Sequence, residues 1–149
     1  MKVREVMVTP VVTVTPETTY EDAALLLHKH KVSGMPVVDK NGELVGIISE
    51  KDLFRALYPL YEEYLADPEA YANQEDREND IKDIRKQPIE KYMVRHVLTI
   101  DADACILRAG GLMLARGVHR LPVVHEGKLV GIVTREDIYG TILKKHLGH

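Results

Sequence analysis

Short apolar runs recur along the chain, and two stretches of them are near copies of each other. The stretch from Val123 to Asp137 is an apolar run, a glycine turn and a second apolar run that ends in Thr134, with Asp137 three residues later. The stretch from Val37 to Asp52 repeats this order with Ser49 in place of the threonine. Each copy therefore predicts a strand, a hairpin, a second strand and the start of a helix.

A helix-like pattern precedes each copy. From residue 18 or 19 to about residue 30, apolar positions recur at helical spacing, with acids near the start and lysines near the end. Its counterpart runs from about 104 to 116 and contains Gly110-Gly111, which predicts close packing against another backbone. Apolar runs at 11–14 and 97–100 predict a buried strand ahead of each helix.

Each repeat thus predicts the order strand, helix, strand, strand, helix, which is an α+β arrangement. The middle strands carry Pro36 and Pro122 near their starts, and we expect edge positions there because proline has no N–H to donate. We expect the first repeat with its lead-in at 1–57, an insertion at 58–92 and the second repeat at 93–149. The insertion is acidic and contains tyrosines, and we expect it to be partly helical because long structureless insertions are unusual in compact domains.

Composition narrows the class of protein. The 149 residues are 45% hydrophobic and 29% charged, which is typical of a globular domain. No apolar run approaches the roughly 20 residues of a membrane span, and no signal peptide is visible, so we expect a cytoplasmic protein without membrane contact. A net charge of -3 argues against a nucleic-acid partner.

No catalytic or metal-binding motif is visible in the sequence. Cys105 is the single cysteine, and we expect it to be a small core residue. The histidines outside the candidate ligand-binding residues show no shared spacing with carboxylates that predicts a metal site, and we read them as surface residues; they are His28, His96, His125, His146 and His149. Neither a nucleophile elbow nor a glycine-rich phosphate loop is present, so we expect no enzymatic activity.

The two copies resemble a known family. The segments from Gly34 to Asp39 and from Leu44 to Asp52, each followed by its second copy in the same order, resemble the tandem CBS (cystathionine β-synthase) domain, whose paired form is called a Bateman module. The resemblance covers nearly the whole chain outside 58–92. It implies two βαββα motifs packed as a pseudo-twofold pair through their sheets, two clefts that bind adenosine-containing ligands, and a homodimer.

The hydroxyl and acid pairs at the helix starts have two interpretations. Ser49 with Asp52, and Thr134 with Asp137, predict helix caps without any further function. The resemblance adds a second role, because in this family the same carboxylate accepts hydrogen bonds from ribose hydroxyls. Capping and ribose binding are compatible, and we expect the ribose role above all for Asp137.

The resemblance also points to phosphate-binding residues. His119 and Arg120 lie in a stretch that resembles the nucleotide-binding part of the AMP-activated protein kinase regulatory subunit, and arginine suits a phosphate because its planar fork bonds two oxygens. His30 and Lys31 resemble another phosphate-facing form of the family. A solvated helix end, favourably placed against the helix dipole, is the alternative for that pair.

For the adenine base, the resemblance implies backbone groups and apolar side chains in two clefts. They are Thr13, Val14, Ser33 and Met35 in one cleft, and Thr99, Ile100 and Leu121 in the other. Ordinary core packing is the alternative for the apolar members. The clefts are expected to differ, because Gly140 replaces Arg55 between the final helices.

These observations predict a non-catalytic regulatory module, of the kind used in energy sensing, that binds AMP, ADP, ATP or S-adenosylmethionine. It requires no cofactor beyond this regulatory ligand, and its regulated protein partner is unknown. A dimerising scaffold with vestigial clefts is one alternative. A nucleic-acid-binding CBS protein is another, and the charge balance disfavours it.

Overall fold

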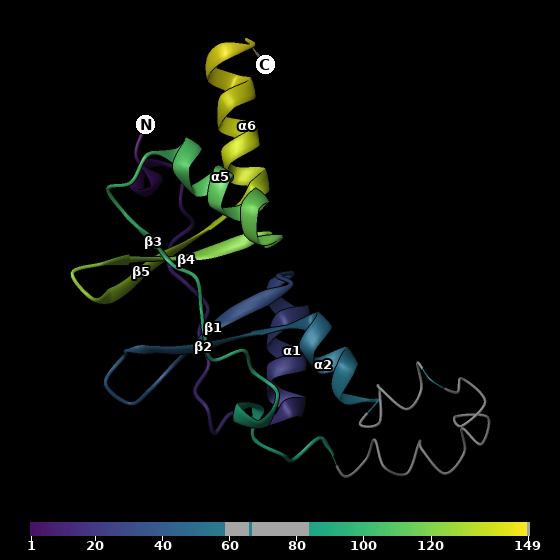
Figure 1. Cartoon of the computed structure of the whole chain (residues 1–149). Coiled ribbons are helices and arrows are strands. Elements are labelled where there is room, and N and C mark those ends of the chain that lie inside the picture. The colour runs from purple at the N-terminus through teal and green to yellow at the C-terminus, as the bar shows by residue number, and fades with distance from the viewer. Residues whose placement is uncertain (59–65, 67–83, 149) are drawn as a thin grey trace. The chain divides into compact units, whose positions relative to one another are not determined.

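The computed structural model describes residues 1–58, 66 and 84–148 of the chain (Figure 1). These residues divide into two compact units. Unit 1 consists of Met1–Val12, Asp39–Val45 and His96–His149, and unit 2 consists of Thr13–Val38 and Gly46–Arg95. Most of the expected insertion at 58–92 falls outside the described residues, so its helices stay a prediction.

Unit 1 is built on a three-stranded sheet in the order β3-β4-β5. The short strand β3 (Ile100–Asp101) runs parallel to β4 (Arg120–His125), and β4 runs antiparallel to β5 (Lys128–Thr134). The helices α5 (Ile106–Arg116) and α6 (Arg135–His146) pack against each other, and they contact β4 and β5 respectively (Figure 1).

The start of the chain completes the core of unit 1. The 3-10 helix η1 (Val3–Glu5) brings the fully buried Val3 side chain into a cluster with Ile106, Met113 and other apolar residues of the second repeat. The backbone N–H of Val3 donates to the carbonyl of Ala104 at 2.8 Å, which fixes the lead-in beside β3. Residues from both ends of the sequence therefore share one core.

Unit 2 contains the matching elements of the first repeat, except that Leu44 and Val45 fall in unit 1. The strands β1 (Gly34–Val38) and β2 (Leu44–Ser49) form a two-stranded sheet, and α1 (Tyr20–His30) packs against α2 (Glu50–Ala56).

The 3-10 helix η3 (Ile89–Lys91) supplies the fully buried Ile89 to unit 2, as η1 supplies Val3 to unit 1. In each unit, the lead-in of one repeat thus packs with the strands and helices of the other. The boundaries 1–57, 58–92 and 93–149 describe the repeat in the sequence and stay a prediction at that level.

The mixed α and β fold class is confirmed, and three details of the strands are wrong. The stretch 11–14 forms only a single parallel bridge, from Val14 to Val37, because no second partner pairs with it among the described residues. The stretch 97–100 contributes only Ile100 to β3. Strand β4 is not an edge strand, since it pairs on both sides; β3 pairs with it only at Val123 and Val124, beyond Pro122.

Two expectations about small residues are also wrong. Cys105 is exposed, because it is the N-cap residue of α5 and lies just outside the buried face of that helix. A Cβ atom built on Gly110 would meet Ile138 at an ordinary 3.8 Å, and one built on Gly111 would meet no described atom within 4 Å. The glycine pair therefore does not mark a close approach of backbones. None of the helices in the described ranges is long and apolar enough to cross a membrane.

Candidate functional site

Both predicted caps form at the starts of α2 and α6. The Ser49 hydroxyl accepts a hydrogen bond from the Asp52 N–H at 3.2 Å, and the Thr134 hydroxyl accepts one from the Asp137 N–H at 3.2 Å. In return, Oδ2 of each aspartate accepts the backbone N–H of its cap residue at 2.9 Å. These capping boxes hold both carboxylates at a helix N-terminus, where the dipole favours negative charge.

The two carboxylates differ in how much of their hydrogen-bonding capacity the cap consumes. Oδ2 of Asp52 accepts a second bond, from the Ser49 hydroxyl at 2.8 Å. The corresponding bond from the Thr134 hydroxyl to the Asp137 carboxylate is not formed among the described residues. Oδ1 of Asp52 and of Asp137 accepts no hydrogen bond from any described residue. The Asp137 carboxylate therefore retains more hydrogen-bond acceptor capacity than that of Asp52.

The same sequence pattern also forms a cap elsewhere in unit 2. The Thr19 hydroxyl accepts the Asp22 N–H at 3.1 Å at the start of α1, and Asp22 is exposed. Neither residue belongs to the predicted site. The pattern by itself therefore gives a cap, and a ligand role depends on what lies around it.

Around Asp137, the sheet brings basic side chains to the helix start. The register of β4 and β5 places Arg120 opposite Thr134, and the carbonyl of the exposed His119 accepts the Arg135 N–H at 3.1 Å. Arg120 is half-buried. Four predicted residues of unit 1, which are His119, Arg120, Thr134 and Asp137, are thus brought to one place by a strand pairing.

Glu136 is a member of this neighbourhood that sequence reasoning missed. Its pKa lies below the ordinary value for a glutamate, first because its own backbone N–H bonds the carboxylate and next because the Thr134 hydroxyl does. The charges of His119 and Arg120 act in the same direction. The negative charge of Glu136 would therefore compete with an anionic ligand for His119 and Arg120. Only the antiparallel register reveals that proximity, since sixteen positions separate Arg120 from Glu136 in the sequence.

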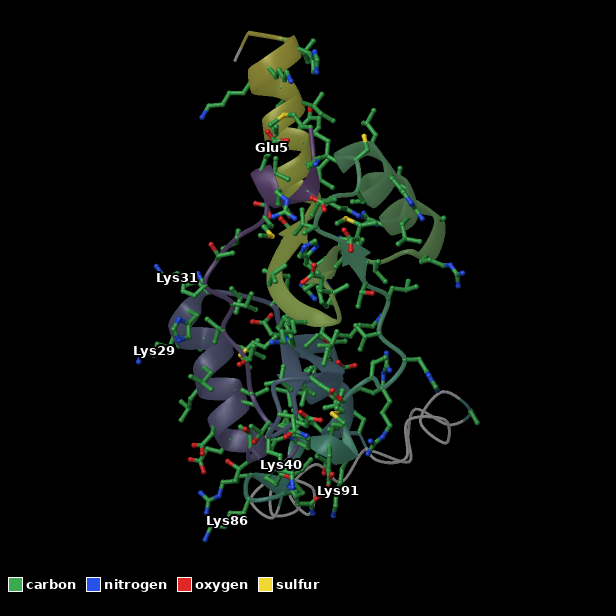
Figure 2. All side chains as sticks on the ribbon, turned by 90° about the vertical axis from the view of Figure 1, so that its left-hand side faces the viewer. Glu5, Lys29, Lys31, Lys40, Lys86 and Lys91 are labelled. Atoms are coloured by element: carbon green, nitrogen blue, oxygen red, sulfur yellow. The ribbon has the colours of Figure 1, made fainter. Side chains whose placement is uncertain are left out.

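His30 and Lys31 lie at the C-terminal end of α1, opposite its N-cap residue Thr19. Both are exposed, and Figure 2 shows Lys29 and Lys31 directed away from the helix. Lys31 is the C-cap residue with a left-handed backbone (φ 53°), a conformation that costs a non-glycine residue free energy. In the same unit, the Ser33 carbonyl accepts the Glu50 N–H at 2.9 Å, which ties the segment after α1 to the start of α2.

The predicted base-binding residues separate into exposed and core positions. Met35 and Leu121 are fully buried, and Val14 and Ile100 are 4% and 5% exposed. Their side chains serve the core, so only their backbone groups remain for a ligand. Thr13 and Ser33 are exposed and belong to unit 2, whereas the half-buried Thr99 belongs to unit 1.

Thr99 and Ile100 line a pocket of about 410 Å³ in unit 1. Arg108 and Leu112 of α5 form another part of its wall, together with Asp101. This volume lies in the range of small-molecule sites. Arg108 was not among the predicted residues, because nothing in its spacing separates it from other exposed helix positions.

Comparison with known proteins defines the class to which this fold and these caps belong. The family model for the CBS domain matches residues 3–59 and 89–144. The chain belongs to the CBS domain family, and its two matched segments make it a CBS domain pair.

Three individual proteins show how close this likeness is. The protein MJ1426 of Methanocaldococcus jannaschii, which has no described function, is 34% identical over 96% of this chain and 92% of its own length. The CBS domain pair of MJ0100, solved with 5'-methylthioadenosine and S-adenosyl-L-methionine, is 28% identical with a TM-score of 0.73, covering 97% of this chain and 98% of that one. CBSX2, solved with AMP, is 29% identical with a TM-score of 0.73, covering 96% of both chains.

Proposed function

We propose that this chain is a non-catalytic regulatory module that binds an adenosine-containing ligand through the residues at the start of α6. One observation carries the proposal: the strand register places Arg120 opposite Thr134, the cap residue of an aspartate that keeps one carboxylate oxygen unused by the described residues. The equivalent start of α2, with Ser49 and Asp52, is a second candidate site. AMP, ADP, ATP and S-adenosylmethionine are the candidate ligands.

The chemistry of this arrangement suits a nucleotide. A fixed, ionised carboxylate is a strong acceptor for the two hydroxyls of a ribose. Asp137 is held in place by its cap, so little conformational freedom is lost when the sugar binds. Arg120 and His119 supply the charge for a phosphate, and the guanidinium can bond two phosphate oxygens.

The complexes of the relatives support the ligand class. CBSX2 binds AMP, and the MJ0100 pair binds 5'-methylthioadenosine and S-adenosyl-L-methionine. All three ligands contain adenosine, and they differ in what the ribose carries at its 5' carbon. We infer that the adenosine part is the shared requirement, and that the basic residues select what is attached to it.

Titration calorimetry of the purified chain with each candidate ligand tests the proposal. Asp137→Asn keeps an oxygen for the cap and removes the charge, and we expect it to weaken binding at the α6 site by roughly 10 to 100-fold, the value of about 1.5–3 kcal/mol for a hydrogen bond to a charged group. Asp52→Asn tests the α2 site in the same way. Asp22→Asn is the matched control, because Asp22 belongs to the third Ser/Thr-x-x-Asp cap, which lies outside the proposed sites.

Thermal unfolding with and without ligand separates capping from binding. A ligand at a hundred times its dissociation constant stabilises the chain by about 2.7 kcal/mol. We expect Asp137→Asn to lose this ligand-induced gain while its unfolding without ligand changes little. Absence of saturable binding for all four ligands in the wild-type chain would rule the proposal out and would favour a scaffold with vestigial sites.

A dimerising role has its own structural support. Leu107 and Leu114 of α5 are 65% and 75% exposed, and Tyr139 of α6 is 65% exposed. Large apolar side chains exposed on two helices that pack together are candidates for an interaction surface. We propose that the chain forms a homodimer through these helices. Light scattering should give the mass of two chains for the wild type and a lower mass for Leu114→Asp; an unchanged mass in that variant would contradict this interface.

A role in energy sensing and the identity of a regulated protein partner belong to the same proposal. A ligand shifts a regulatory equilibrium only by its different affinity for two states. The relative affinities for AMP and ATP are therefore the measurement that addresses energy sensing. Equal affinities for both would speak against it.

A further inference from the structure

Three side chains outside the proposed nucleotide sites converge at one end of the sheet in unit 1. Asp101 ends β3, His125 ends β4, and Asp103 lies in the turn after β3. Nδ1 of His125 is 3.9 Å from Oδ1 of Asp101 and 3.9 Å from Oδ2 of Asp103. One donor atom from each of the three residues lies within 4.8 Å of the other two.

The backbone that carries these residues is held by hydrogen bonds. The parallel register pairs Asp101 with Val124, the neighbour of His125, and the Ala102 N–H donates to the Val124 carbonyl at 2.9 Å. The turn closes with the Ala104 N–H on the Asp101 carbonyl at 3.0 Å. The three side chains therefore project from strand ends and a closed turn, which are rigid positions suited to a binding site.

The imidazole has an unsatisfied atom directed at the two carboxylates. Although 35% of the His125 side chain is exposed, its Nδ1 atom is buried and has no hydrogen-bond partner among the described residues. A separation of 3.9 Å is too long for a hydrogen bond. Burying a polar atom without a partner costs free energy, so such an atom in a folded protein calls for a missing partner.

The carboxylate of Asp103 is divided between two sets of neighbours. Its Oδ1 accepts Arg4 Nε at 2.8 Å and lies 3.6 Å from Lys2 Nζ. Its Oδ2 is the oxygen that faces His125. Arginine thus orients the carboxylate through one oxygen and leaves the other for a different partner.

The other nitrogen of the imidazole also has an acidic neighbour. Nε2 of His125 is 3.9 Å from Oε1 of Glu126. The Glu126 carboxylate thus adds a third acidic group beside the imidazole.

We propose that Asp101, Asp103 and His125 bind a divalent transition-metal ion such as Zn²⁺. Two carboxylate oxygens and one imidazole nitrogen are a donor set that suits zinc and similar ions, with water in the remaining positions. Donors that lie about 2.0–2.2 Å from a tetrahedral ion are about 3.3–3.6 Å from one another, so the side chains must move slightly inward from their separations of 3.9 Å to share one ion. The argument for this site does not rest on the proposed nucleotide binding, although Asp101 also lines the pocket that contains Thr99 and Ile100.

The sequence conceals this set because Asp101 and His125 belong to different strands. Their spacing along the chain matches no common metal-binding motif, and the expectation of no metal site followed from that. The parallel pairing of β3 with β4 brings them together. Asp101 and Asp103 are exposed acids, which are common on protein surfaces. The buried Nδ1 atom of His125, which has no hydrogen-bond partner among the described residues, distinguishes this cluster from other pairs of surface acids.

Titration of the full chain with Zn²⁺, and with Co²⁺ as a spectroscopic probe, tests the proposal. We expect one equivalent of Zn²⁺ to bind and to displace Co²⁺. His125→Gln and Asp101→Asn each should weaken this binding by at least about tenfold, because each removes a direct ligand. His28→Gln is the matched control, since His28 is exposed on α1 and outside the set.

One further variant should act in the opposite direction. Arg4→Met removes a positive charge that competes for Asp103, so we expect tighter Zn²⁺ binding than in the wild type. A merely structural role for the three side chains predicts no such gain. Binding that persists unchanged in His125→Gln, or a wild-type chain without saturable binding at micromolar Zn²⁺, would overturn the proposal.

Discussion

A methyl group added at Gly46 should destabilise unit 2 strongly. A Cβ atom at this position would lie 2.8 Å from the Met93 sulfur and 2.9 Å from the Val94 carbonyl oxygen. The sulfur can rotate away, but the carbonyl belongs to the backbone bridge in which Ile47 and Val94 exchange two hydrogen bonds of 2.9 Å. Room for the methyl group therefore requires displacement of the lead-in segment from β2.

The size of the effect follows from what must move. Overpacking in a close-packed region costs about 1–3 kcal/mol, and each backbone hydrogen bond that is lost adds about 0.5–1.5 kcal/mol. We therefore expect Gly46→Ala to lower the free energy of unfolding by about 1–3 kcal/mol from overpacking alone, and by more if a backbone hydrogen bond is lost. For a chain of this size, about 2–4 °C of melting temperature is lost per kcal/mol. Urea denaturation and thermal unfolding both measure this loss.

The second repeat supplies a matched comparison at Gly131. A Cβ atom there would lie 2.5 Å from the Met7 sulfur and 2.9 Å from the Met7 Cγ, with no backbone atom among its three nearest neighbours. Methionine is flexible, so Gly131→Ala should cost less than Gly46→Ala. Adding Met7→Ala should recover most of that loss, whereas adding Met93→Ala to Gly46→Ala should recover only part, because the Val94 carbonyl remains.

A helix position provides the control of opposite sign. A Cβ atom on Gly111 would meet no described atom within 4 Å, and the residue lies inside α5. Gly111→Ala should therefore raise the free energy of unfolding by about 0.5–1 kcal/mol. Gly46→Ala with wild-type stability, or a larger loss for Gly131→Ala than for Gly46→Ala, would refute the packing argument.

Three further predictions concern charge and backbone. Lys31→Gly should stabilise the chain in urea by roughly 1 kcal/mol, because it relieves a left-handed non-glycine residue, and it should weaken phosphate binding only if this lysine contacts the ligand. The pKa of Asp103 is lower in the folded chain than its ordinary value of about 3.9. Its contribution to stability is therefore present at pH values above about 3.9 and is lost as the pH falls through the pKa of the folded state. Arg4→Met should reduce this loss of stability at acid pH, which unfolding measured as a function of pH detects. Glu136→Gln should increase affinity for phosphate-bearing ligands in calorimetry, because it removes an acid that competes for Arg120.

The local elements could be predicted from the sequence because their causes are local. Hydroxyl and acid at the right spacing produced the caps of α2 and α6, and the helical spacing after Thr19 produced α1 with its bounds nearly correct. Glycine turns between apolar runs produced both hairpins. These features depend on residues within a few positions of one another, which is the range that a sequence pattern reports.

Features that depend on pairing between distant segments could not be predicted. The burial of Val3 among residues of the second repeat, the central position of β4, and the convergence of Asp101 with His125 all follow from strand partners. The exposure of Cys105 was also missed, because Cys105 is the residue just before α5 and not part of the buried face of that helix. A residue's own neighbours in the sequence do not disclose these partners.

The repeat also shows why the two candidate nucleotide sites should differ. The first turns of α2 and α6 carry the same net charge, because Glu50-Lys51 in one is matched by Arg135-Glu136 in the other. The difference must therefore come from the basic residues outside these turns. In unit 1 the strand register fixes Arg120 opposite Thr134, whereas in unit 2 the basic residues lie at an exposed helix end.

Under the proposed function, an arginine held by the sheet opposite the cap residue of Asp137 would lose little entropy on binding a phosphate, and a lysine at an exposed helix end would lose more. The caps also favour the α6 site, because the Asp52 carboxylate accepts a hydrogen bond from the Ser49 hydroxyl and the Asp137 carboxylate accepts no equivalent bond. The position of Arg120 and the hydrogen bonding of the caps thus both favour ligand binding at the α6 site. Identical ligand affinities at the two sites would mean that neither the register nor the cap decides the binding free energy.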